Sequence, residues 1–179
     1  GVNIEVIGMS LAHYAIAILG ALTIVFGTLM AIRQDDAKKL LAYSSLAHVG
    51  LIAAGCYTLT LDGLSGAVHQ MIAHGFVIVG LFFAAEIIYR RYNTRTISDL
   101  GGIRAQAPKF TSLFMILVLA SVALPGTYNF VGEFTVLYSL SQVNIWLAVF
   151  GGLTIILGAY YMLKMFQNVM LGETNTTVF

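Results

Sequence analysis

The chain has 179 residues, of which 59% are hydrophobic and only 9% are charged, and its formal net charge is +1. Soluble domains carry about a quarter charged residues, so this composition excludes a water-exposed globular domain and indicates a protein embedded in a bilayer. The few charges are local and form no basic surface, which excludes a nucleic-acid footprint.

Apolar segments in the first half of the chain predict three membrane spans, at residues 9–32, about 40–59 and 66–89. Each is long enough to cross a hydrocarbon core of about 30 Å at 1.5 Å per residue. A charged turn separates the first two spans, and there Asp35 or Asp36 is suited to cap the second helix.

The apolar run 110–140 predicts a fourth span, but it is too long for one untilted crossing. We place an interruption at Pro125 and Gly126, because proline removes a backbone donor and glycine loosens the helix. Residues 145–171 form the fifth span. The predicted fold is therefore an all-α integral membrane protein with five transmembrane helices in a single domain over residues 1–179.

Basic residues gather in the loops of one side. The turn 33–39 holds three basic residues, and the segment 90–109, which is suited to a short surface helix, holds five against Asp99 alone. The loops of the other side carry Asp62 and no Lys or Arg. By the positive-inside rule, the basic loops face the cytoplasm, which puts the N-terminus outside and the C-terminus inside. Because Gly1 directly precedes a span, we expect a piece of a longer polypeptide.

Three ionisable side chains lie deep within the predicted spans: His48, His74 and Glu133. An ionised group inside a bilayer is costly unless it is paired or hydrated, so it is a functional candidate by default. Each has a polar neighbour one turn earlier on the same helix face, namely Ser44, Gln70 and Asn129. Three such polar stripes facing one another can hold water and pass protons, because histidine changes charge near neutral pH. The pattern predicts a proton pathway.

Structural interpretations stay open beside this one. A single membrane histidine bonded to a hydroxyl or a carbonyl often joins two helices, and Glu133 can be a neutral acid packed in a kinked helix. Two histidines and an acid at matching depth favour proton conduction. Lys38 and Lys39 border the second span, where they mark topology or bias proton entry.

Other polar residues have simpler explanations. His13 and His69 lie near span ends and suit interfacial positions, and Glu86 is placed to pair with Arg90 one turn later. Cys56 is the only cysteine, so it can hold neither an iron–sulfur cluster nor an internal disulfide. No nucleotide, flavin or haem motif is present, so we expect no cofactor and no metal here, and any redox chemistry belongs to other chains.

Three motifs together carry a resemblance to a known family: D-A-K-K-L-L-A-Y-S-S-L-A-H-V-G at 36–50, G-A-V-H-Q-M-I-A-H-G at 66–75 and L-P-G-T-Y-N-F-V-G-E-F at 124–134. They closely resemble the antiporter-like membrane subunits of bacterial NADH-quinone oxidoreductase, respiratory complex I, of the M type, whose mitochondrial counterpart is subunit 4. The resemblance implies the second of two inverted five-helix repeats, with the interrupted span as its fourth helix.

The resemblance also implies a function. The chain would belong to a proton-translocating subunit of the bacterial inner membrane, coupled to electron transfer in other subunits of the enzyme and in contact with further antiporter-like subunits. His48, His74 and Glu133 look like members of the family's central hydrophilic axis. Related subunits often carry lysine where Glu133 stands, which favours the M type. The alternatives are a subunit of a multisubunit cation/proton antiporter or of a membrane-bound hydrogenase, and a structural scaffold.

Overall fold

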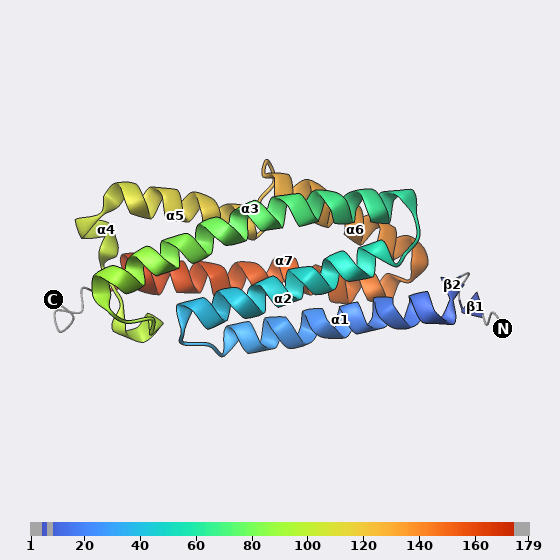
Figure 1. Ribbon diagram of the computed structural model, residues 1–179, viewed down its shortest axis with the longest axis horizontal. Coiled ribbons are helices and arrows are strands. Elements are labelled where there is room, and N and C mark those ends of the chain that lie inside the picture. The colour runs from blue at the N-terminus through green and yellow to red at the C-terminus, as the bar shows by residue number, and fades with distance from the viewer. Residues whose placement is uncertain (1–4, 7–8, 174–179) are drawn as a thin grey trace.

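A computed structural model describes residues 5–6 and 9–173 of the chain. Helices run side by side along one long axis and form an elongated bundle (Figure 1). Ahead of the bundle, the two-residue strands β1 (Glu5–Val6) and β2 (Met9–Ser10) pair antiparallel. The predicted extent of the single domain reaches into residues that lie outside the described ones.

Nine helical elements follow in the described part of the chain. They are α1 (Leu11–Ile32), α2 (Ala37–Cys56), α3 (Leu61–Tyr92), the 3₁₀ turn η1 (Ile97–Asp99), α4 (Ile103–Gln106), α5 (Pro108–Ser121), α6 (Tyr128–Val143), α7 (Ile145–Phe166) and the π-helical turn η2 (Gln167–Leu171). Four of the described helices are long and apolar enough to cross a membrane: α1, α2, α3, and α7 continued through η2. Short helices η1 and α4 occupy the loop where a surface helix was predicted.

Helix boundaries differ from the predicted ones where caps decide them. The side chain of Asp36 accepts from the N–H of Lys39 at 3.0 Å, so α2 begins three residues earlier than predicted. Thr60 caps α3 by accepting from the N–H of Gly63 at 2.9 Å, which lets polar residues form the first turn of that helix. The sequence predicts a loop at these residues, so this part of the prediction is wrong.

The predicted interruption is present between α5 and α6. Helix α5 ends at Ser121 and α6 begins at Tyr128, with Pro125 and Gly126 in the loop between them. Gly126 has φ of 101°, a left-handed conformation that glycine adopts without steric cost. The two short helices lie end to end along one side of the bundle, where α3 packs against both (Figure 1). Together they cover the length that the other helices cover singly.

Polar residues fill the middle of the bundle between two apolar clusters. One cluster includes Leu41 of α2 and Leu81 of α3, and the other includes Leu51 of α2 and Ala67 of α3. Along both helices the buried polar side chains fall between these positions, so the apolar clusters close the polar centre from either end. The polar centre is the candidate site.

One end of the bundle, formed by residues 33–36 and 93–107, carries the basic loops; we call it the basic end. There the N–H of Ala37 donates to the carbonyl of Arg95 at 2.9 Å, and the N–H of Ile97 donates to the carbonyl of Asp35 at 2.6 Å. These bonds fasten the start of α2 to the segment after α3.

Candidate functional site

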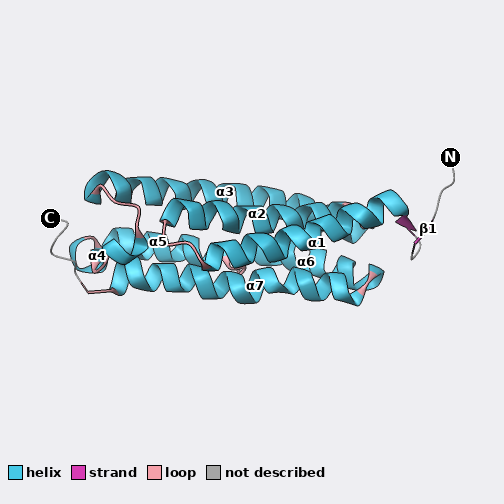
Figure 2. Cartoon of the chain, turned by 90° about the horizontal axis from the view of Figure 1, so that it is seen from below, coloured by secondary structure: helices cyan, strands magenta, loops and turns pink. Residues whose placement is uncertain are grey.

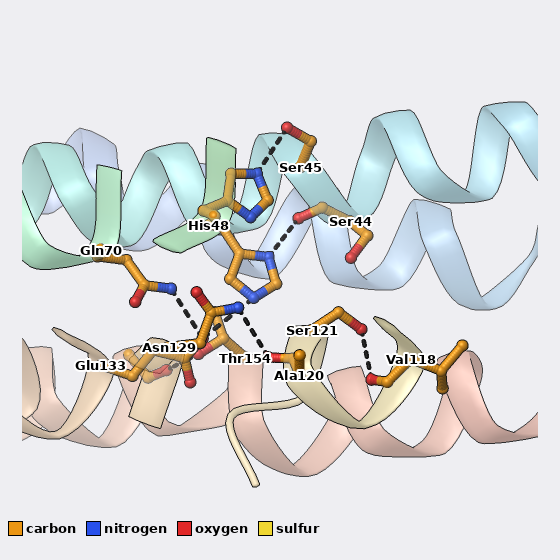
Figure 3. Close-up of polar contacts among 12 residues, drawn as sticks. Ser44, Ser45, His48, Gln70, Val118, Ala120, Ser121, Asn129, Glu133 and Thr154 are labelled. Atoms are coloured by element: carbon orange, nitrogen blue, oxygen red, sulfur yellow. Dashed lines mark hydrogen bonds and ion pairs between the residues drawn. The ribbon is translucent and has the colours of Figure 1, made fainter. Parts of the chain in front are cut away.

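A histidine from α2 and a glutamate from α6 meet at the centre of the bundle. Nε2 of His48 lies 3.1 Å from Oε1 of Glu133, and the two side chains are only 3% and 1% exposed. The side-chain amide of Gln70, from α3, donates to the same carboxyl oxygen at 3.1 Å (Figure 3). Side chains from α2 and α3 therefore converge on one carboxyl oxygen of α6.

The hydrogen bonds of His48 define where protons can reside. Its Nδ1 lies 2.8 Å from the backbone carbonyl of Ser44, and because a carbonyl only accepts, Nδ1 carries a hydrogen. The contact between Nε2 and Oε1 of Glu133 then requires one proton shared by the pair. Either an imidazolium faces a carboxylate, or a neutral imidazole accepts from a protonated acid. The pair can hold one proton and pass it along a single hydrogen bond.

A second imidazole lies against the first. The rings of His48 and His74 are stacked, with centroids 4.7 Å apart and planes 16° apart, and Nε2 of His74 lies 3.0 Å from Oγ of Ser45. Two positive charges at this separation in a buried site would repel each other strongly. The stack therefore favours one charge at a time on the two rings.

The broken end of α5 is held by α6. The amide nitrogen of Asn129 donates to the carbonyl of Ala120 at 2.7 Å, and the hydroxyl of Ser121 donates to the carbonyl of Val118 at 2.7 Å (Figure 3). These bonds add side-chain donors to carbonyls of the last turn of α5, which also accept from the backbone N–H groups of Val122 and Ala123. Asn129 thereby fixes the first turn of α6, and Glu133 follows one turn later.

Close backbone approach brings Gln70 to Glu133. A Cβ atom added at Gly132 would lie 2.7 Å from the backbone nitrogen of Gln70 and 2.6 Å from its Oε1. Glycine at this position lets α3 and α6 pack tightly enough for the amide to reach the carboxyl group. The residue next to Glu133 thus decides the distance between the two helices.

Four buried polar atoms at this centre have no hydrogen-bond partner among the described residues: Oε1 of Gln70, Nδ1 of His74, Oδ1 of Asn129 and Oε2 of Glu133. Buried polar groups are normally paired, and exceptions concentrated in one place point to function rather than packing. Two of these atoms, Oε2 of Glu133 and Nδ1 of His74, belong to titratable side chains.

The structure brings together most of the residues singled out from the sequence. Gln70, one turn before His74 on α3, bonds Glu133 of α6, and Ser44 bonds His48 through its backbone carbonyl. The lysines at the start of α2 lie away from this centre. Lys38 forms an ion pair with Glu86, and Lys39 is exposed.

The residues expected to be structural lie outside the centre. The ring of His13 packs against Tyr57, with centroids 5.9 Å apart, and the ring of His69 packs against Tyr128 at 5.5 Å. The predicted pair between Glu86 and Arg90 is present at 2.8 Å, at the basic end of α3.

Two further residues, Ser45 and Tyr161, contact the polar centre although their sequence context does not single them out. The hydroxyl of Tyr161, from α7, donates to Oγ of Ser44 at 2.9 Å, although its ring is 2% exposed and packs with the core. A tyrosine in an apolar helix is typical of packing, so only the position of Ser44 opposite it reveals the polar role. The pair Ser44-Ser45 was visible in the sequence, but which hydroxyl faces His74 depends on the rotation of α2.

Within the described ranges, no group of three or more His, Cys, Asp or Glu side chains is arranged to hold a metal ion.

The fold and the site define a multi-pass helical membrane protein in which a buried acid, just after a break in a helix, contacts a histidine of a neighbouring helix. A family description, "NADH:quinone oxidoreductase/Mrp antiporter, TM", matches residues 4–158. The chain belongs to this family.

Curated relatives agree with this assignment. The chain is 42% identical over 161 residues to NADH-quinone oxidoreductase subunit M of Rickettsia typhi, covering 89% of this chain and 33% of that protein. It is 43% identical over 156 residues to subunit M of Rhodobacter capsulatus, covering 87% and 30%. NADH-ubiquinone oxidoreductase chain 4 of Arabidopsis thaliana is 38% identical over 155 residues, covering 87% and 31%. The chain spans about a third of the length of these relatives.

Two solved structures share the fold. A chain of respiratory complex I from Thermus thermophilus superposes with a TM-score of 0.89 at 35% identity, over 93% of this chain and 36% of that one. A chain of the Mrp complex from Dietzia superposes with a TM-score of 0.86 at 23% identity, over 90% of this chain and 30% of that one. The second likeness concerns the fold alone.

Proposed function

We propose that the chain is part of a proton-translocating membrane subunit of an NADH-quinone oxidoreductase in the bacterial inner membrane. Electron transfer in other subunits would drive protons through His48, His74 and Glu133, and the partners would be further membrane subunits, including antiporter-like ones. The observation that carries this proposal is the buried contact between His48 and Glu133, which holds one transferable proton. Redox centres would belong to other chains.

The geometry supports a simple transfer step. When a proton moves from His48 to Glu133, the bond from Nε2 to hydrogen breaks and a bond from Oε1 to hydrogen forms, and an ion pair becomes a neutral pair. Gln70 donates to Oε1 and stabilises the charged form of the acid. A charge brought near the site from another subunit would shift this balance. Glu133 would then release its proton toward the end of the bundle opposite the basic end.

The membrane topology is part of the same proposal. Helix α5 has 14 residues and α6 has 16, so neither crosses a bilayer alone, but both extend along the same long axis as α7 (Figure 2). We count them as one interrupted crossing, which gives five crossings and one of two inverted repeats. The basic end then faces the cytoplasm, with the start of α1 outside.

Cysteine labelling in the full-length subunit tests this topology. Lys109, at the start of α5, and Gln142, near the end of α6, are both exposed, so each can be replaced by cysteine in a Cys56→Ala background. We expect a membrane-impermeant thiol reagent to label Lys109→Cys only from the cytoplasmic side and Gln142→Cys only from the other side. Labelling of both positions from one side would contradict a single crossing by α5 and α6.

The proposed activity is tested with the whole complex in liposomes. Addition of NADH and a quinone should acidify the lumen in a medium without sodium, at a rate that follows NADH oxidation. Transport that needs sodium and proceeds without NADH would favour the cation/proton antiporter alternative. Quinone reduction without any ion movement would refute the translocating role.

A further inference from the structure

A small cleft lies at the basic end, between the end of α3, α4 and the start of α5. It has a volume of about 110 Å³ and mostly apolar walls, which include Ile87 and Ile88 of α3, Ile103 of α4 and Phe110 of α5. Ile87 is 43% exposed and Arg91 is also exposed, so the cleft opens to the outside of the bundle. An open apolar cleft at the end of a membrane span suits a hydrocarbon chain.

Arg91 is the charged group on the wall of this cleft. Two other polar residues of the wall bond each other, since the hydroxyl of Tyr92 donates to Oε1 of Gln106 at 3.1 Å. Two more cations, Arg104 of α4 and Lys109 of α5, are exposed, and each stands next in the chain to a residue that lines the cleft. Each of the three helices that form the cleft therefore carries one cation at it or beside it.

Three other basic residues at this end already have partners. Lys38 and Arg90 pair with Glu86, and the guanidinium group of Arg95 lies over the ring of Tyr89, 4.3 Å from its centroid. The three cations of the cleft have no acid partner among the described residues. The start of α5 also has no side-chain cap, so its first N–H groups add to the positive potential there. Uncompensated positive charge therefore lies beside an apolar cleft.

We propose that this cleft binds an anionic phospholipid, with the phosphate on Arg91, Arg104 and Lys109 and the first part of an acyl chain between the apolar walls. The proposal goes beyond the proposed function and requires only that the basic end lies at a membrane surface. Basic pockets between membrane helices bind anionic head groups, and a guanidinium group matches a phosphate with two parallel hydrogen bonds. A soluble anion would leave the apolar walls unused, whereas a phospholipid matches both parts of the site.

The test uses the full-length subunit in its complex, in phosphatidylcholine vesicles. They contain a rising fraction of phosphatidylglycerol with a photoreactive diazirine near the carboxyl end of one acyl chain. After illumination, mass spectrometry of peptides that cover residues 87–110 gives the mole fraction of lipid at half-maximal labelling. The native chain should saturate, whereas a phosphatidylcholine probe with the same acyl chain should label in proportion to its amount.

Single substitutions test the charged part of the site. Arg91→Gln, Arg104→Gln and Lys109→Gln should each raise the half-maximal mole fraction about fivefold, the factor that one basic residue supplies at an anionic surface. Arg91→Lys keeps the charge and should raise it less. Arg33→Gln is the matched control, because it removes an exposed cation at the same end that does not line the cleft, and it should saturate as the native chain does. Equal labelling by both probes, or unchanged saturation in the three glutamine variants, would overturn the proposal.

A second measurement separates a phospholipid from a soluble anion. Inorganic phosphate added at constant ionic strength should leave the labelling unchanged, because it cannot replace the acyl chain in the cleft. Loss of labelling on addition of phosphate would indicate an anion site only and would overturn the lipid site. If the glutamine variants label as the native chain does while replacing Glu133 abolishes pumping, this proposal fails and the proposed function stands.

Discussion

Replacing Glu133 with glutamine should abolish proton pumping while the complex still assembles. Glutamine has the same shape and keeps a partner for Gln70 and for His48, so the packing of α3, α2 and α6 is retained. It cannot take up or release a proton near neutral pH. Loss of a positioned acid or base typically costs about 10²- to 10⁴-fold in rate, so pumping per NADH oxidised should fall by at least the lower figure.

The control is the same substitution at the basic end. Glu86 pairs with Lys38 and Arg90 but is 35% exposed, and exposed ion pairs contribute little to stability. Because Glu86 lies at the basic end, away from the polar centre, Glu86→Gln should leave the pumping rate close to the native one. Both variants are compared at equal amounts of assembled complex. Normal pumping by Glu133→Gln would remove Glu133 from the pathway.

Much of the fold follows from hydrophobic segments and loop charges. Long apolar helices lie where four spans were predicted, and the break at Pro125 and Gly126 follows from the chemistry of these two residues. The beginnings of α2 and α3 were less predictable, because a single capping side chain decides whether the next polar residues extend the helix or form a loop. Asp36 was recognised as a candidate cap and Thr60 was not.

The depth of the site residues in the bundle can be predicted from the sequence, but their contacts cannot. Depth along each helix follows from counting residues, so His48, His74 and Glu133 could be placed at one level. Which atoms touch depends on helix rotation and on close backbone approach, as at Gly132, which no periodicity in this chain reveals. For this reason the sequence placed Gln70 on the same helix face as His74 but did not reveal its bond to Glu133. Tyr161 was out of reach because its partner is 117 residues away in the chain.

The second large effect is expected for His48→Leu. Leucine removes the imidazole that faces Oε1 of Glu133 and leaves a buried acid with only the amide of Gln70. Breaking a buried ion pair by removing one partner costs about 3–5 kcal/mol, unless the remaining acid stays protonated. Either outcome stops proton transfer, so pumping should be lost, and the amount of assembled subunit should also fall. His69→Leu is the control, because His69 lies on α3 outside the polar centre, with its ring against Tyr128. It should change neither the pumping rate nor the amount of assembled subunit.

Loss of pumping with poor assembly would not by itself distinguish a pathway from a scaffold, but the double variant His48→Leu, Glu133→Leu does. Replacing both partners of a buried pair with apolar residues is often neutral or stabilising, so assembly should recover. Pumping should not recover, since the pair that shares the proton is gone and only His74 is left. If the polar centre only holds the helices together, adding His74→Leu as well should leave a complex that assembles and pumps normally. Restored pumping would refute the pathway, whereas restored assembly without pumping would exclude the scaffold, because the two properties would then depend on different features of the same residues.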